Sequence, residues 1–227
     1  MPKESKGVRL DHISKIYTDP KTGKDFYAVH DVSLDIAPGS FVTLLGPSGC
    51  GKTTTLRMVA GFESPDEGEI YLGGQPINEL TPNKRDTAMV FQSYALFPHY
   101  NVFDNVAYGL KLRKVPKAEI EQRVRTILDL VEMGGMESRM TNQLSGGQQQ
   151  RVAIARALAS KAPIILADEP TGNLDSKNSK EIVELLKVSV KKYNQTLIMI
   201  THDTNIALQA DRVITIEDGI IKSDEVI

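Results

Sequence analysis

The sequence is most informative at Phe41-Val-Thr-Leu-Leu-Gly-Pro-Ser-Gly-Cys-Gly-Lys-Thr53, which continues into Thr54-Thr-Leu-Arg-Met-Val-Ala60. Its first five residues form a short apolar run, which is typical of a strand buried within a parallel sheet. Residues 46–53 match the pattern G-x-x-x-x-G-K-S/T, and residues 52–60 are expected to be helical. A buried strand, a glycine-rich turn and a helix in this order predict a loop that binds phosphate.

The residue types of this loop suit a nucleoside triphosphate with Mg²⁺. Glycines let the backbone curl so that its N–H groups surround phosphate oxygens, and the helix N-terminus adds partial positive charge. Lys52 is expected to reach the terminal phosphates, and the Thr53 hydroxyl to ligate Mg²⁺. The alternative is a glycine turn that merely begins a helix, but a chance match is expected in roughly one chain of this length in a hundred. The residues expected to contact the nucleotide here are Gly46, Pro47, Ser48, Gly49, Cys50, Gly51, Lys52, Thr53 and Thr54.

A second apolar run, Ile164-Ile-Leu-Ala-Asp-Glu169, ends in two acids. Asp168 would lie at the carboxyl edge of the sheet, where open α/β sheets bind ligands, and can hold Mg²⁺ through its water shell. Glu169 is then free to orient and polarise the water that attacks the γ-phosphorus. An acid pair that caps a surface strand is the alternative. Beside a phosphate loop, we favour catalysis.

A second glycine-bearing helix start occurs at Leu144-Ser-Gly-Gly-Gln148. Ser145 is a good N-cap, and the exposed N–H groups of Gly146 and Gly147 predict a second anion site. Without the other motifs, this segment would indicate only a capped helix.

The rest of the chain alternates strands with helices, which predicts an α/β fold with a largely parallel sheet. Alternating apolar and polar residues predict an antiparallel hairpin of strands 8–16 and 29–36, with turn formers between them at 18–25. Residues 92–142 differ in sequence pattern from the rest of the chain and are interpreted as a mostly helical insertion. Further elements are expected as helices over 145–159 and 178–192, strands over 164–167 and 196–200, and a hairpin over 213–221.

Composition narrows the classes of protein that fit. The 227 residues include 27 Lys and Arg against 29 Asp and Glu, a net charge of −2. This provides no basic field for a duplex, so nucleic acid is not expected as a partner. A single cysteine cannot form an internal disulfide and suits a reducing compartment. No apolar stretch approaches the roughly 18 to 20 residues that span a bilayer, and residues 1–10 indicate a short frayed lead into the first strand, not a secretory signal.

Together these motifs resemble the nucleotide-binding subunit of ABC transporters. Segments 46–53, 144–148, 168–170, 172–175 and 201–203, with Gln92, occur in the order and approximate spacing of that family over nearly the whole chain. The resemblance implies a P-loop NTPase core with an antiparallel β subdomain and a helical insertion. It also implies an ATPase that uses ATP and Mg²⁺. We expect one domain over 1–227, with 1–91 and 143–227 forming the core and β subdomain and 92–142 the helical subdomain.

Several roles come only from this resemblance. Tyr17, just after the first strand, resembles the aromatic that stacks on adenine; Gln92 resembles the glutamine that joins the metal site to the helical insertion; and His202 resembles the switch histidine that contacts the γ-phosphate. Two subunits of the family pack head to tail, with each ATP between the phosphate loop of one and residues 144–148 of the other. Asp175 is similar to the loop residue that crosses the dimer axis. The expected catalytic residues are therefore Lys52, Gln92, Glu169 and His202, the metal contacts Thr53, Gln92 and Asp168, and the further nucleotide contacts Tyr17, Ser145, Gly146, Gly147, Gln148 and Asp175.

The resemblance also implies partners. These are integral membrane permease subunits and a second ATP-binding subunit, identical or different, with the chain peripheral at the cytoplasmic face of the membrane. Residues 91–109 are similar to importer subunits, whereas 143–156 and 167–176 are more like subunits for lipoprotein release or macrolide export. Those importer subunits usually continue into a C-terminal regulatory domain, and this chain stops at Ile227. The sequence leaves import and export both open, with some weight on a compact ATPase of an import system. Tyr94, Phe97 and Tyr100 are expected either to line a groove for a permease helix or to pack inside the insertion.

Two other functions fit the sequence less well. A soluble ABC-type ATPase acting on ribosomes or DNA would usually carry tandem cassettes, a long coiled-coil insertion or a basic surface, and the sequence indicates none of these. A regulatory switch that binds ATP without turnover is disfavoured because Glu169 and His202 are both present.

Overall fold

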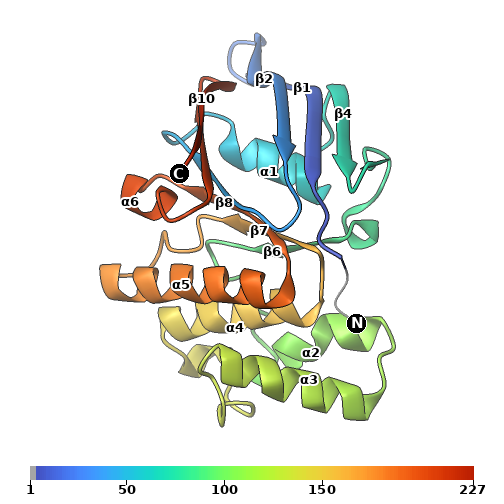
Figure 1. Ribbon diagram of the computed structural model, residues 1–227, viewed down its shortest axis with the longest axis vertical. Helices are drawn as coiled ribbons and strands as arrows, with labels where there is room; N and C mark the ends of the chain where they lie inside the picture. Colours follow the sequence, from blue (N-terminus) through green and yellow to red (C-terminus); the bar gives the residue numbers. More distant parts are fainter. Residues whose placement is uncertain (1–3) are drawn as a thin grey trace.

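The larger of two sheets forms the centre of the computed structural model, which describes residues 4–227 (Figure 1). Its strand order is β10-β9-β3-β8-β7-β6, and all neighbouring strands except the β9–β10 pair are parallel. The strands are β3 (Phe41–Leu45), β6 (Thr87–Val90), β7 (Ile164–Asp168), β8 (Thr196–Thr201), β9 (Arg212–Glu217) and β10 (Ile220–Val226). This confirms the prediction of an α/β fold with a largely parallel sheet.

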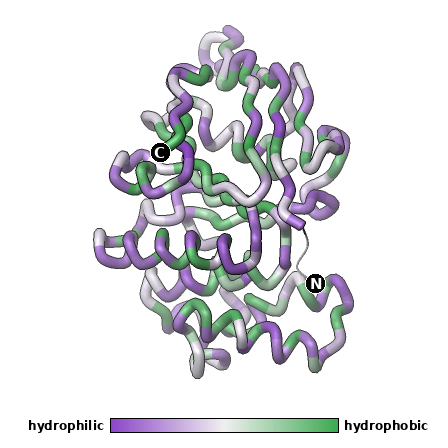
Figure 2. Tube along the Cα trace, viewed as in Figure 1, coloured by the Kyte–Doolittle hydropathy of each residue, from purple (hydrophilic) through white to green (hydrophobic). Residues whose placement is uncertain are grey.

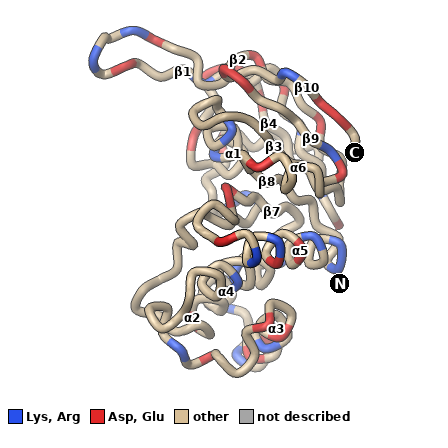
Figure 3. Tube along the Cα trace, turned by 90° about the vertical axis from the view of Figure 1, so that its left-hand side faces the viewer, with Lys and Arg blue, Asp and Glu red and all other residues tan. Residues whose placement is uncertain are grey.

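The second sheet is antiparallel, in the order β2-β1-β4-β5. Its strands are β1 (Val8–Thr18), β2 (Asp25–Ile36), β4 (Glu67–Leu72) and β5 (Gln75–Pro76). The β1–β2 hairpin is longer than the sequence indicated and projects from the body of the molecule (Figure 3). Cross-strand pairs extend it, since Tyr17 lies opposite Phe26 and the Thr18 hydroxyl donates to Asp25 at 2.7 Å. The placement of Tyr17 after the first strand was therefore wrong, because it lies within β1.

Helices cover both faces of the larger sheet. In Figure 1, α1 lies between the two sheets, whereas α4 and α5 lie on the other face with α2 and α3 beyond them. Asp175 accepts a hydrogen bond from the Asn178 N–H and begins α5 two residues earlier than expected. The helices are α1 (Lys52–Ala60), α2 (Val102–Leu112), α3 (Lys117–Leu130), α4 (Gly146–Ala159), α5 (Ser176–Tyr193) and α6 (Thr204–Ala207), with 3-10 turns η1 (Pro82–Lys84) and η2 (Thr141–Gln143).

The strands of the larger sheet are apolar on both faces because each face has its own core. Val42 and Leu44 pack with α1 and the antiparallel sheet, whereas Phe41 packs with the helices on the opposite side. This explains the continuous apolar runs. In Figure 2 hydrophobic residues run through the interior, and α5 turns a largely hydrophilic side outward. Val106 of α2 and Val124 of α3 belong to the same core as Phe41, on the side of the larger sheet that α4 and α5 cover. The division of the chain at residues 92 and 142 stays a prediction.

The lead expected over residues 1–10 lies only partly in the described part of the chain, because residues 1–3 are outside it. Val8 and Leu10 belong to β1 and are buried. None of the helices in residues 4–227 has both the length and the apolar character that crossing a bilayer requires.

A pair of leucines tests the assignment of the core. Leu166 in β7 is fully buried, whereas Leu112 at the end of α2 is 67% exposed. We expect Leu166→Ala to lower the free energy of unfolding by about 2–5 kcal/mol, because it leaves a cavity. Leu112→Ala should change it by less than about 0.5 kcal/mol. Urea denaturation followed by circular dichroism measures both, and equal losses would contradict this core.

Candidate active site

Four parallel strands deliver the sequence motifs to one edge of the larger sheet. The phosphate loop follows β3, Gln92 follows β6, β7 ends at Asp168 and β8 ends at Thr201. Because the carboxyl ends of parallel strands share an edge, segments far apart in the sequence meet there. The structure therefore gathers Lys52, Gln92, Asp168, Glu169 and His202.

The phosphate loop curls around its own lysine. Lys52 is buried, and its Nζ donates to the carbonyl oxygens of Gly46 at 2.8 Å and Pro47 at 2.7 Å. The Sγ of Cys50, also buried, lies 3.6 Å from the same Nζ. The ammonium thus lies at the centre of the loop, within reach of an anion that the loop would hold.

A hydroxyl and a carboxylate form the second part of the site. The Thr53 Oγ1 donates to Asp168 Oδ1 at 3.1 Å, which joins the start of α1 to the end of β7. Burial raises the pKa of the Asp168 carboxyl, and the hydrogen bond from Thr53 partly offsets this effect. Hydroxyl and carboxylate oxygens are the hard ligands that Mg²⁺ prefers, so these two residues fit the metal expected from the sequence.

Glu169 and His202 face one another from neighbouring strands. The His202 Nδ1 lies 3.3 Å from Glu169 Oε2, and the two side chains are 61% and 20% exposed. Glu169 has a φ of 45°, a left-handed conformation that is uncommon outside glycine and that clusters at functional sites. The backbone turns sharply here and separates the directions of Asp168 and Glu169.

Residues 91–101, between β6 and α2, form the Gln92 loop, which is held from two sides. The Asn173 Nδ2 donates to the Gln92 carbonyl at 3.0 Å, and a Cβ on Gly172 would overlap the Gln92 amide. Arg156 of α4 donates to the carbonyl oxygens of Ala95 at 2.6 Å and Tyr94 at 3.1 Å. Arg156 is not among the site residues expected from the sequence. Its signal was a charged residue among the apolar positions of α4, where burial lowers its pKa.

The second glycine-bearing helix start forms a capping box. The Ser145 Oγ accepts from the Gln148 N–H at 3.3 Å, and the Gln148 Oε1 accepts from the Ser145 N–H at 3.0 Å. Gly146 and Gly147 leave no room for a Cβ, which would meet the Tyr94 hydroxyl at 2.8 Å and Asn178 Oδ1 at 2.7 Å, respectively. The capped start therefore packs closely against both the Gln92 loop and α5.

This capped start lies apart from the phosphate loop of the same chain. Helices α1 and α4 pack on opposite faces of the larger sheet (Figure 1). Within residues 4–227, no hydrogen bond or ion pair joins 144–148 to 46–53. Asp175 is close to the capped start through Asn178, whose N–H and Nδ2 donate to it at 2.8 and 2.7 Å and lower its pKa.

Tyr17 lies on the hairpin that adjoins the phosphate loop. Its ring centroid is 6.1 Å from that of Phe26, and Lys15 Nζ is 5.5 Å from the Tyr17 centroid. The same strand as Phe26 continues past the loop, where a Cβ on Gly51 would overlap the Ala28 carbonyl oxygen. Tyr17 is thus held at one side of the loop by a structure that contacts the loop directly.

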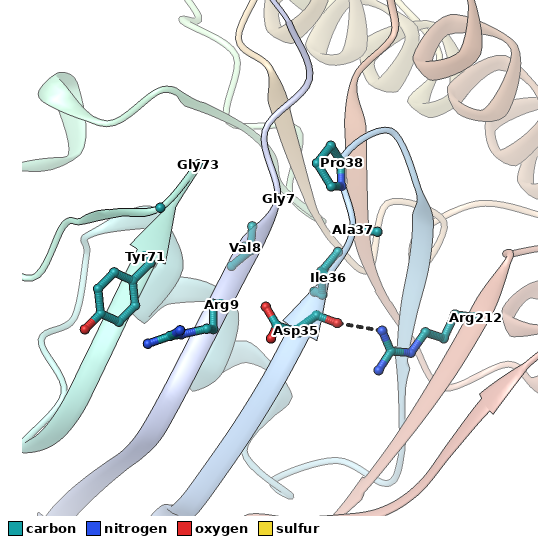
Figure 4. A pocket seen from close by; sticks show the side chains of 11 residues that line it. Gly7, Val8, Arg9, Asp35, Ile36, Ala37, Pro38, Tyr71, Gly73 and Arg212 are labelled. Carbon is teal, nitrogen blue, oxygen red and sulfur yellow. Dashed lines mark hydrogen bonds between the residues drawn. The ribbon is translucent and has the colours of Figure 1, made fainter.

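A cavity of about 590 Å³ lies away from this site, and none of the site residues expected from the sequence line it. It lies between the antiparallel sheet and the start of β9, where Figure 4 shows Arg212 hydrogen-bonded to the Asp35 carbonyl. Since β9 is parallel to β3, its start is at the opposite edge from the phosphate loop. The arginines there are paired, Arg9 with Asp11 and Arg212 with Asp224.

Comparison with known proteins agrees with this geometry. The family model described as "ABC transporter" matches residues 29–172. This chain belongs to the ABC transporter family. It is 48% identical to the spermidine/putrescine import ATP-binding protein PotA of Acidothermus cellulolyticus, over 96% of this chain and 57% of the relative. It is also 48% identical to the Fe(3+) ions import ATP-binding protein FbpC of Photobacterium profundum, over 86% of this chain and 56% of the relative. The chain thus spans a little over half the length of these curated relatives.

A solved structure covers nearly the whole fold. The dimeric structure of MJ0796, described as a bacterial ABC transporter cassette, is similar with a TM-score of 0.87 and 36% sequence identity. The match covers 96% of this chain and 98% of that one. The α/β architecture, with its antiparallel sheet and inserted helices, is therefore that of ABC cassettes.

Two glycines of the loop form a matched pair for mutation. Gly49 and Gly51 have φ of 80° and 103°, but only at Gly51 would a Cβ meet other atoms, those of Ala28 and Val29. We expect alanine at either position to cost about 1–2 kcal/mol through the left-handed backbone. Gly51→Ala should cost more, because it also forces the loop away from β2. Thermal unfolding measures the difference, and a larger loss for Gly49→Ala would contradict this loop geometry.

Proposed function

We propose that this chain binds and hydrolyses ATP with Mg²⁺ and thereby powers transport of a solute across a membrane. The observation that carries the proposal is the convergence at one sheet edge of Lys52, the Thr53–Asp168 hydrogen bond and the Glu169–His202 pair. A phosphate loop alone would fit many nucleotide-binding proteins. The added acid beside a histidine supports hydrolysis.

Each residue has a distinct part in the proposed reaction. The loop N–H groups and Lys52 bind the phosphates, with the Lys52 ammonium exchanging its two carbonyl partners for phosphate oxygens. Thr53 and Asp168 would hold Mg²⁺, with Gln92 as the further contact that the family resemblance implies. The metal would neutralise charge on the phosphates. Glu169 accepts the proton of the attacking water. His202 contacts Glu169 through Nδ1 and would contact the γ-phosphate through Nε2.

The proposal includes a second ATP-binding subunit, because residues 144–148 lie on the face of the sheet opposite α1. A head-to-tail partner would bring its own capped start, with Ser145, Gly146, Gly147 and Gln148, to the triphosphate held by this chain's loop. Asp175, beside that start, would then lie near the dimer axis. The dimeric description of the MJ0796 cassette supports the presence of a second subunit.

The remaining partner is a membrane permease, with this chain at the cytoplasmic face. A groove of about 350 Å³, lined mostly by apolar side chains, lies between the Gln92 loop, α2 and the end of α4. Phe97 lines it, Tyr100 beside it is 39% exposed, and Tyr94 instead packs over Gly146. We propose that a cytoplasmic helix of the permease occupies this groove.

We propose import as the direction of transport. Both relatives described above have import in their names, and they match 86–96% of this chain. At the same 48% identity one is named for spermidine and putrescine and the other for Fe³⁺, so similarity in this segment does not select a cargo. Selection of the cargo is accordingly assigned to other subunits.

Glu169→Gln separates binding from hydrolysis. The amide cannot accept the proton of the attacking water, so we expect phosphate release to fall by about 10²–10⁴-fold while ATP binding persists. ATP should then hold the variant as a dimer, which gel filtration at saturating ATP detects. Lys52→Ala serves as the control that fails to bind. Monomeric Glu169→Gln with bound ATP would contradict the dimer, and undiminished phosphate release would contradict the role of Glu169.

Tyr17 is tested through nucleotide affinity. Loss of base stacking in Tyr17→Ala should weaken ATP binding by roughly 5- to 100-fold. Tyr17→Phe keeps the ring and should bind within a factor of about two of the original chain. Titration calorimetry gives both dissociation constants. Equal weakening in the two variants would indicate that the hydroxyl, and not stacking, matters.

A further inference from the structure

The connection between α2 and α3 is a basic turn with an exposed leucine. We define the basic turn as residues 111–117, Lys-Leu-Arg-Lys-Val-Pro-Lys. It holds four Lys and Arg and no acid, in a chain whose net charge is −2. All of its residues are exposed except Val115, and Leu112 is 67% exposed. The turn lies at the right-hand edge of the molecule in Figure 1.

Two of these cations have no carboxylate partner in the described part of the chain. Arg113 donates to a backbone carbonyl, that of Ser160, and Lys114 has no ion pair there. Lys111 pairs with Asp104 at 2.6 Å, and the Nζ of Lys117 is only within 4.0 Å of Glu121. Arg113 and Lys114 therefore contribute positive charge that no carboxylate in the described part balances.

The basic turn continues directly from the apolar groove. Gly109 and Leu110, the residues just before it, line the groove, and so does Ser160, the acceptor of the Arg113 hydrogen bond. Lys161 follows Ser160 and adds another exposed cation. If a permease helix occupies the groove, the basic turn lies on the side of the chain that approaches the bilayer.

We propose that the basic turn contacts anionic phospholipid headgroups beside the permease, with Leu112 inserted among them. The inference rests on the proposed function for the position of the membrane. Cytoplasmic leaflets carry negative surface potential, which attracts clustered Lys and Arg, and an apolar side chain adds a second, charge-independent contribution. Leu112 lies between Lys111 and Arg113, so the exposed apolar side chain and the cations would reach the same headgroups.

Flotation with protein-free vesicles tests the proposal. One set is phosphatidylcholine alone, and the other contains about one-third phosphatidylglycerol. The test variant is Leu112→Ser with Lys114→Glu. The matched control is Val188→Ser with Lys187→Glu on α5, where Val188 is 45% exposed and Lys187 is exposed. Both double variants make the same change in net charge, and circular dichroism confirms that each is folded.

We expect the original chain to bind the anionic vesicles, to release them as salt is raised, and to ignore phosphatidylcholine. The variant in the basic turn should bind the anionic vesicles about tenfold less than the original chain. The α5 variant should bind them as strongly as the original chain does. No binding to anionic vesicles, or equal losses in both variants, would overturn the proposal. Vesicle binding is measured without ATP, so failure of ATP hydrolysis would count against the proposed function separately.

Discussion

The contact between the Thr53 hydroxyl and the Asp168 carboxylate depends on one constraint, that β3, β8, β7 and β6 are parallel and adjacent. This constraint places the four chain segments that follow these strands at a single edge. It also explains why strand residues are buried on both faces, since helices or the second sheet cover each side. A single antiparallel strand among these four would send its motif to the opposite edge.

Side chains of α4 hold the loops at that edge through hydrogen bonds to their backbone carbonyls. Arg156 ties α4 to the carbonyls of Tyr94 and Ala95, and the buried Gln150 of the same helix donates to the Pro170 carbonyl at 2.6 Å. Helix α4 is therefore connected both to the Gln92 loop and to the segment after Glu169. A movement of the proposed permease groove would reach the capped start of α4 through these contacts, because rigid packed elements transmit displacement.

The central elements could be predicted from the sequence because their signals are local. The apolar runs at 41–45 and 164–167 and the glycine pattern at 46–53 each indicate their own local structure. Parallel pairing then follows from alternation of strands and helices. What depended on distant partners could not be predicted, including the extension of β1 through Tyr17, the role of Arg156 and the left-handed backbone at Glu169. The roles of individual site residues stay proposals, since they depend on a nucleotide and a second chain.

Complementation between two inactive variants tests the composite site most directly. Lys52→Ala disables the phosphate loop, whereas Ser145→Asp keeps a good N-cap but adds negative charge where the triphosphate would bind. In any dimer of either variant alone, both sites would be defective. A mixed dimer contains one intact loop facing one intact capped start, so mixing should restore ATP hydrolysis that neither variant shows alone. Phosphate release no greater than the sum of the separate variants would contradict the head-to-tail site.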